Sequence, residues 1–145
     1  NDISGDPFVS DPVGHGTHVA GIIGAGVNNG IGIRGVTPNV SIIPIQIDAS
    51  PTEPLKISQF IPPSERKIDE LIRKVKPTNS PKQFYADIIA RAILYAINSR
   101  VDIISMSLGW DQGSDSLFMR EMVRQAQERG ILVIAAAGND STRAV

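Results

Sequence analysis

Three short apolar segments alternate with two amphipathic ones in this 145-residue chain, and this alternation limits most how the chain can fold. The apolar segments are 41–48 (SIIPIQID), 101–108 (VDIISMSL) and 131–137 (ILVIAAA), each of a length typical of a buried strand. Segments 84–99 and 116–129 repeat apolar side chains every three or four residues, which predicts helices. The pattern favours a three-layer α/β fold, in which a parallel β-sheet has helices on both faces.

The C-terminal ends of the predicted strands are where a site is expected. Right-handed crossovers bring these ends to one edge of a parallel sheet, and such folds bind ligands there. The residues predicted at this edge are Asp48, Ser107–Gly109 and Gly138–Asp140. Gly130 is expected to end the second helix as its C′ residue.

Residues 49–82 interrupt the alternation. They hold six of the ten prolines and one amphipathic stretch, 64–75, that is predicted to be a short helix. A connection of this length is usually a functional loop or an inserted subdomain. We therefore predict one domain over 1–145, with an insertion at about 49–82.

The composition excludes several classes of function. Apolar residues make up 41% and charged residues 20%, which is typical of a globular protein. A net charge of -1 without blocks of like charge gives no indication of a nucleic acid or an anionic membrane as partner. No apolar run approaches the length of a membrane span. The absence of cysteine excludes disulfides, thiolate metal sites and a cysteine nucleophile.

The segment 14–21 (GHGTHVAG) opens a helix that is predicted to run from His15 to about Ala25. Flanking glycines allow a substrate to approach His15 closely, and the positive end of a helix favours the neutral imidazole that a general base requires. Taken alone, His15 is interpreted more readily as a helix cap or as a hydrogen-bonded structural residue than as a general base. His18 lies one turn further on, but a histidine pair at this spacing lacks the further ligands of a typical zinc site. We expect His18 to pack under the helix and to make a structural hydrogen bond.

Three ordered motifs resemble those of the subtilisin-like serine proteases, the subtilase or peptidase S8 family. Segment 14–21 resembles the histidine motif of the family, 104–109 (ISMSLG) its substrate-binding strand, and 135–139 (AAAGN) its oxyanion-hole segment. The run before the histidine, with Asp11, is similar to the family's lead-in. The resemblance covers nearly all of the chain outside 49–82 and implies a central fragment of the catalytic domain.

The resemblance implies roles for particular residues. His15 would be the general base, and the side-chain amide of Asn139 would donate to the tetrahedral intermediate, although Asn139 alone reads as a turn residue. An extended peptide would pair with the run Ser107, Leu108 and Gly109. Ser107 is not expected to be the nucleophile, because it lies in a predicted strand without a sharp exposed turn.

Segment 27–36 resembles the loop with which many subtilases bind a structural calcium. The resemblance implies the carbonyls of Val27, Ile31 and Ile33 and the side-chain oxygen of Asn29 as ligands. Calcium takes six to eight oxygens, so an empty or weak site is expected at least as much as a filled one. The alternative is a glycine-rich loop that returns the helix to the sheet. No cofactor is required for the chemistry.

A Ser-His-Asp triad also needs a nucleophile and an orienting acid. None of Asp2, Asp6 and Asp11 matches the family's Asp-Ser/Thr-Gly motif, and no Gly-Thr-Ser-Met-Ala motif occurs. We therefore expect the parent protein to be a serine endopeptidase for peptide or protein substrates. The isolated chain is expected to be inactive, to self-associate, and to depend on the remaining parts of the domain.

The main alternative is a catalytically inactive, subtilase-like binding module. A nucleotide-binding domain is disfavoured, because no glycine-rich phosphate loop follows a predicted strand. The family resemblance implies a secreted or cell-envelope protein.

Overall fold

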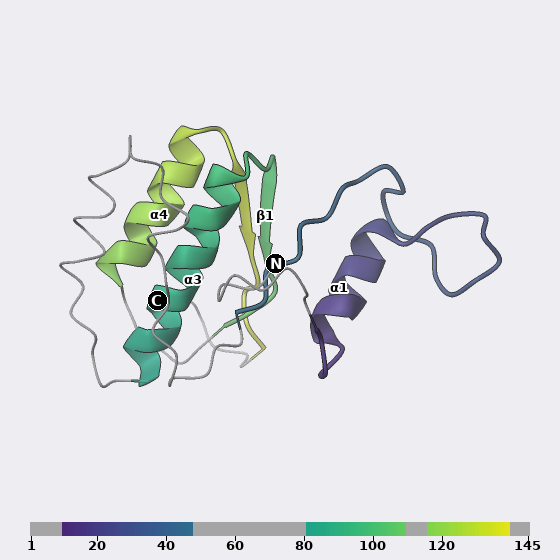
Figure 1. The fold of residues 1–145 in the computed structure, drawn as a ribbon, viewed down its shortest axis with the longest axis horizontal. Helices are drawn as coiled ribbons and strands as arrows, with labels where there is room; N and C mark the ends of the chain where they lie inside the picture. The colour runs from purple at the N-terminus through teal and green to yellow at the C-terminus, as the bar shows by residue number, and fades with distance from the viewer. Residues whose placement is uncertain (1–9, 48–80, 110–115, 140–145) are drawn as a thin grey trace. The chain divides into compact units, whose positions relative to one another are not determined.

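The computed structural model describes residues 10–47, 81–109 and 116–139. The chain divides into two compact units, Asn1–Gln46 and Ile47–Val145, and each is described by itself. The first unit contains helix α1 (His15–Gly24) (Figure 1). The second contains, in chain order, α3 (Pro81–Asn98), β1 (Ile103–Met106), α4 (Leu117–Glu128) and β2 (Leu132–Ala135). The helix predicted at 64–75 lies outside the described residues.

Strands β1 and β2 form a two-stranded parallel sheet, and α4 connects them. Ile103 lies opposite Leu132, and Met106 lies opposite Ala135. Beyond the last pair, the Ala136 N–H donates to the Met106 carbonyl at 3.1 Å. Both strands are shorter than predicted, because only the central residues of each apolar segment pair. The parallel pairing across a helix confirms the predicted α/β class.

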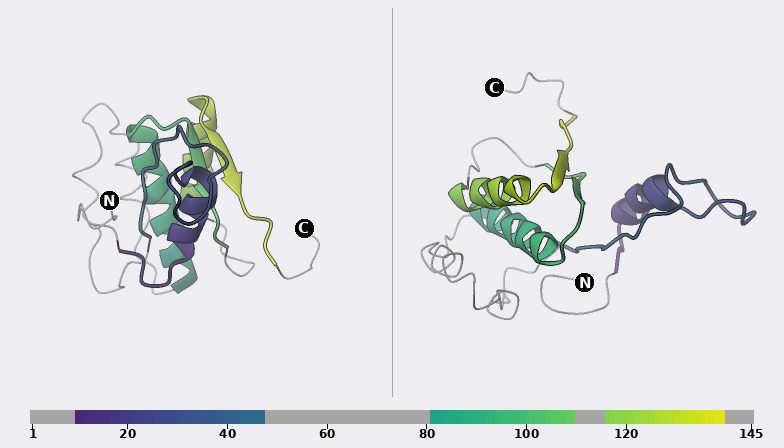
Figure 2. Two further views of the ribbon diagram at one scale, coloured as in Figure 1. Left: turned by 90° about the vertical axis from the view of Figure 1, so that its right-hand side faces the viewer. Right: turned by 90° about the horizontal axis from the view of Figure 1, so that it is seen from above.

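The core of the second unit lies between α3, α4 and one face of the sheet. Figures 1 and 2 show both helices on the same side of β1 and β2. The largest fully buried side chains come from the two helices and are Ile88, Ile93, Leu94 and Met122. Ile104 of β1 is buried, whereas Ile103, Leu132 and Ile134 are 55%, 56% and 48% exposed. The described helices of this unit therefore cover one face of its sheet, and the helix layer on the other face stays a prediction.

Helix α4 has a defined start and a defined end. The Ser116 side chain accepts a hydrogen bond from the Met119 N–H at 3.3 Å, as an N-cap does. At the other end, Gly130 has a φ of 76° and the Ile131 N–H donates to the Ala126 carbonyl at 3.0 Å. This pattern is a Schellman motif, and it confirms the prediction that Gly130 is the C′ residue.

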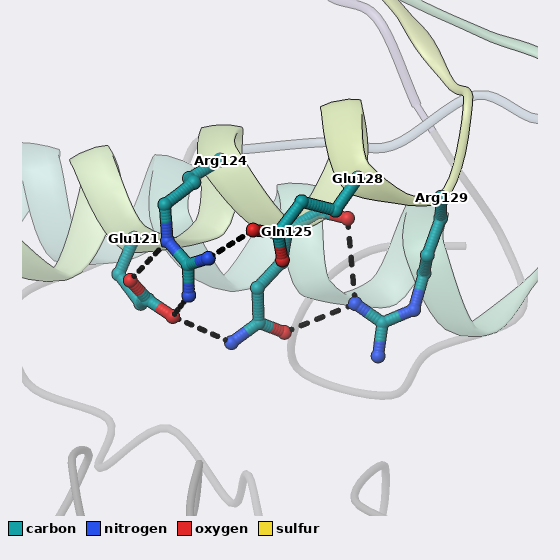
Figure 3. Close-up of polar contacts among 5 residues, drawn as sticks. All are labelled: Glu121, Arg124, Gln125, Glu128 and Arg129. Carbon is teal, nitrogen blue, oxygen red and sulfur yellow. Dashed lines mark hydrogen bonds and ion pairs between the residues drawn. The ribbon is translucent and has the colours of Figure 1, made fainter.

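The outer face of α4 carries a network of charged and polar side chains (Figure 3). Arg124 is ion-paired with Glu121 and with Glu128, three residues before it and four after it. Gln125 donates to Glu121 at 3.0 Å and accepts from Arg129 at 3.1 Å. Pairs at these spacings support a helix modestly, so this face is solvated while the opposite stripe packs.

The described part of the first unit, residues 10–46, has no comparable core. None of the residues of α1 is buried, and Gly35 is the only buried residue among 10–46. Half of the residues of α1 are partly buried, and none is fully buried. None of the helices in the described part of the chain is long and apolar enough to cross a bilayer.

The strand predicted at 41–48 is wrong over its described part. Residues 41–47 contain a single bridge position at Gln46, and Ile42 and Ile43 are each 43% exposed. A strand exists only through its neighbours, and no other described residues of this unit form a ladder with 41–47. Pro44 also lacks the N–H that a central strand needs.

Candidate catalytic residues

His15 is the first residue of α1 and its side chain is exposed. The residue before it, Gly14, is the N-cap and has a φ of 80°, in the left-handed region that disfavours residues with a Cβ. No atom lies within 4 Å of a Cβ built on Gly14, so this position favours glycine because of its backbone conformation and not because space is lacking. The backbone therefore turns sharply into the helix and leaves the imidazole open to solvent, as a general base needs.

The carboxylate of Asp11 closes this turn. Its Oδ1 accepts the Gly14 N–H at 2.9 Å, and its Oδ2 accepts the Thr17 N–H at 2.7 Å. The hydrogen bonds from Thr17 are the largest cause that holds the pKa of Asp11 below its usual value, and the nearby charge of His15 adds to it. From the sequence, we predicted Asp11 in a loop and did not predict its hydrogen bonds to the start of the helix. An acidic residue shortly before a helix start was the available signal.

His18 is exposed, which contradicts the expectation that it packs under α1. The physical reason is that the described residues of the first unit, 10–46, form no buried side-chain core for the imidazole to join. Over the described ranges there is also no cluster of three or more histidine or acidic side chains placed to hold a metal ion.

The C-terminal end of α1 is held by the segment that returns from the glycine-rich loop. The N–H groups of Val36 and Thr37 both donate at 2.9 Å to carbonyls of the last turn, those of Ile22 and Ile23. A Cβ on Gly35 would lie only 2.4 Å from a backbone nitrogen of the helix end. The close approach of the two backbones therefore requires glycine at this position.

In the loop that resembles a calcium site, one of the oxygens proposed as a calcium ligand already accepts a hydrogen bond from the loop itself. The Asn29 Oδ1 accepts the Ile31 N–H at 3.1 Å, which is a local Asx turn. The four proposed oxygens, from Val27, Asn29, Ile31 and Ile33, are all neutral, and calcium takes six to eight ligands that usually include carboxylates. The described residues of this loop thus do not fit a calcium site by themselves.

The second unit places two of the predicted segments together. Ser107, Leu108 and Gly109 follow the end of β1, and Asn139 lies at the corresponding end of β2, after Gly138. Because the strands are parallel and adjacent in register, both segments leave the same edge of the sheet. Gly138 has a φ of 86°, in the left-handed region that favours glycine, and Asn139 is exposed. Asp48 and Asp140, also predicted at this edge, lie outside the described residues.

Comparison with known proteins decides the family. The family model described as the subtilase family matches residues 1–145, the whole chain. The chain belongs to the subtilase family. The search of solved structures gives no match.

The curated relatives that this subtilase chain matches include bacterial proteases. It is 36% identical over 132 residues to the major intracellular serine protease of Bacillus subtilis (strain 168), and 32% identical over 140 residues to subtilisin DY of Bacillus licheniformis. It is 34% identical over 130 residues to the minor extracellular protease Epr of Bacillus subtilis (strain 168). These matches cover 91%, 97% and 90% of this chain but only 31%, 39% and 15% of the relatives.

Membership of the family bears out the resemblance on which the motifs were interpreted. The α/β class follows from it, in agreement with the helices and the parallel strand pair of the second unit. The subtilase chain thus has its predicted base, His15, in the first unit and its predicted oxyanion donor, Asn139, in the second.

Proposed function

We propose that this chain is the central part of the catalytic domain of a serine endopeptidase, with His15 as the general base. The observation that carries the proposal is the position of His15. It is the exposed first residue of a helix, behind a glycine with positive φ, in a chain of the subtilase family. That position leaves the imidazole free to meet a serine hydroxyl and a peptide substrate.

The proposed chemistry is acyl transfer. The imidazole of His15 takes the proton of a serine hydroxyl as the oxygen attacks the scissile carbonyl, and it then gives that proton to the leaving amine. The amide of Asn139 donates to the oxygen that becomes negative. A donor of this kind contributes about 3–4 kcal/mol in subtilisin, the case from which the general figure is taken. Ser107, Leu108 and Gly109 pair with the extended substrate beside this donor.

The serine and the orienting aspartate belong to motifs that this chain does not contain. We therefore expect the isolated chain to be inactive. Its exposed apolar side chains, among them Ile103, Leu132 and Ile134 on one sheet face, support the expectation of self-association. A monodisperse monomer at high concentration in light scattering contradicts that expectation.

The partner, location and metal proposals rest on the family alone. Peptides or proteins are the proposed substrates. The predicted secreted or cell-envelope location stays a prediction, because the relatives are named both intracellular and extracellular. Calcium is proposed as a structural ligand at most, and binding through the oxygens of the 27–36 loop alone is expected to be weak.

Fluorophosphonate labelling of the full-length protein tests the proposal. The wild type is expected to be labelled on serine, and His15→Gln to lose labelling by at least about a thousandfold in rate. His18→Gln is the matched control, because it makes the same change at an exposed histidine one turn along the same helix. It is expected to label like the wild type. Normal labelling of His15→Gln contradicts the assignment of the base, and an unlabelled wild type supports the inactive binding module.

A further inference from the structure

The Asp11 carboxylate lies outside α1 but is bonded to both sides of His15. The first four N–H groups of a helix have no acceptor within it. Asp11 accepts two of these groups, the one before His15 on Gly14 and the one two residues after it on Thr17. The Gly14 N–H also reaches the Asp11 backbone carbonyl at 3.2 Å. Three hydrogen bonds to a single residue, Asp11, therefore hold the backbone on both sides of His15.

The hydrogen bonds of Asp11 differ from those of the orienting acid of a triad. Each of its oxygens already accepts a backbone N–H, and among the described residues no hydrogen bond joins its carboxylate to the His15 imidazole. A Cβ on Gly16 would lie 3.5 Å from Oδ2, so the carboxylate sits against the first turn itself. Asp11 thus acts on His15 through the backbone and leaves the ring free for another acid.

We propose that Asp11 is a positioning residue for the general base, because it fixes the turn from which the His15 side chain projects. The inference rests on the proposed function of His15. The residues of the first turn of α1, 15–18, are all exposed, so side-chain packing among the described residues does not hold this turn. The hydrogen bonds of Asp11 therefore set the direction of the side chain where packing does not.

The kinetic test compares Asp11→Ala, Asp11→Asn and Asp102→Ala in the full-length protein. Asp102 is exposed and belongs to the second unit, so its variant removes a surface carboxylate that is not part of the turn. Misplacement of a catalytic group by about 1 Å can cost up to a hundredfold in rate, so kcat of Asp11→Ala is expected to fall about ten- to a hundredfold with KM unchanged. Asp11→Asn, which keeps one acceptor oxygen, is expected to fall between Asp11→Ala and the wild type. Asp102→Ala is expected to match the wild type.

Active-site titration separates positioning from folding. The proposal predicts an unchanged fraction of active enzyme with a lower kcat for each active molecule. A wild-type kcat in Asp11→Ala, or a loss explained entirely by fewer active molecules, overturns it.

A second readout does not require activity. Nuclear magnetic resonance of full-length protein with labelled histidines is expected to show the His15 ring signals shifted or broadened in Asp11→Ala, while those of His18 stay in place. If the full-length protein has no protease activity, the proposed function is wrong. Shifted His15 signals would then still show that Asp11 positions the His15 side chain. Unchanged His15 signals in an active protease defeat the positioning role alone.

Discussion

Helices α4 and α1 are formed in different ways. Helix α4 buries a stripe of Phe118, Met122 and Ala126 against the rest of its unit and keeps its charged residues outside. Helix α1 has a more apolar sequence, HGTHVAGIIG, yet none of its residues is buried. Its described support comes from its two ends, where Asp11 closes the first turn and the segment around Gly35 closes the last. A fully buried stripe organises α4, whereas α1 combines terminal hydrogen bonds with only partial burial of its residues.

The difference matters for function because the predicted base lies on the helix without a core. Terminal hydrogen bonds fix direction well but contribute little free energy of folding compared with apolar burial. The second unit, by contrast, has a packed core under the strands that lead to Ser107 and Asn139. Different substitutions are therefore expected to destabilise the helix that carries His15 and the strand ends that carry Ser107 and Asn139.

The largest expected effect is a difference between the two units in the free energy of unfolding lost when an apolar side chain is truncated. Met122→Ala removes a fully buried side chain and is expected to lower the free energy of unfolding by about 2–5 kcal/mol. Ile22→Ala on α1 removes a side chain that is 47% exposed and is expected to cost less than about 1 kcal/mol. Urea unfolding of the chain, followed by circular dichroism, measures both. Equal losses contradict the comparison.

Gly35→Ala is expected to damage the first unit alone, by about 1–3 kcal/mol, because the added Cβ would lie 2.4 Å from the Ala25 nitrogen. Faster amide exchange of Val36 and Thr37, which donate to the end of α1, reports the loss. Gly109→Ala is the control, since nothing lies within 4 Å of its added Cβ. Unchanged exchange in Gly35→Ala would show that the two backbones are not in close contact.

Two helix ends in the second unit allow a paired test of about 1 kcal/mol. Gly130 and Arg100 occupy the same C′ position after α4 and α3, with φ values of 76° and 54°. Only glycine adopts this region without steric cost, so Gly130→Ala is expected to destabilise and Arg100→Gly to stabilise by about that amount. Thermal unfolding measures both changes. A stabilising Gly130→Ala or a destabilising Arg100→Gly would contradict the shared motif.

The smallest expected effect is the acid sensitivity of α1. The folded pKa of Asp11 is lowered below 3.8, so its contribution is complete above that value and is lost as the pH falls through the folded pKa. The amide shifts of Thr17 and Gly14 are expected to move as the pH is lowered from about 5 to 2, and not to move in Asp11→Asn. A wild-type Thr17 signal that is constant over this range would show that the carboxylate does not bind there.

The sequence predicted those elements whose local pattern and packing agree. Helix α4, its stripe around Met122 and its end at Gly130 all follow from spacing and from the conformational freedom of glycine. The strand at 41–48 and the packing of His18 failed because each depends on neighbours that the described first unit does not supply. The role of Asp11 was missed because it depends on a loop that folds back onto the helix, which periodicity does not reveal.

Residue-resolved hydrogen exchange of the chain tests most directly whether α1 is held by its ends and α4 by its core. The account predicts that amides in the middle of α4 exchange at least about a thousandfold more slowly than those in the middle of α1. It also predicts that Asp11→Ala speeds exchange in α1 and leaves α4 unchanged. Equal protection of the two helices, or an α1 that does not respond to Asp11→Ala, would contradict the account.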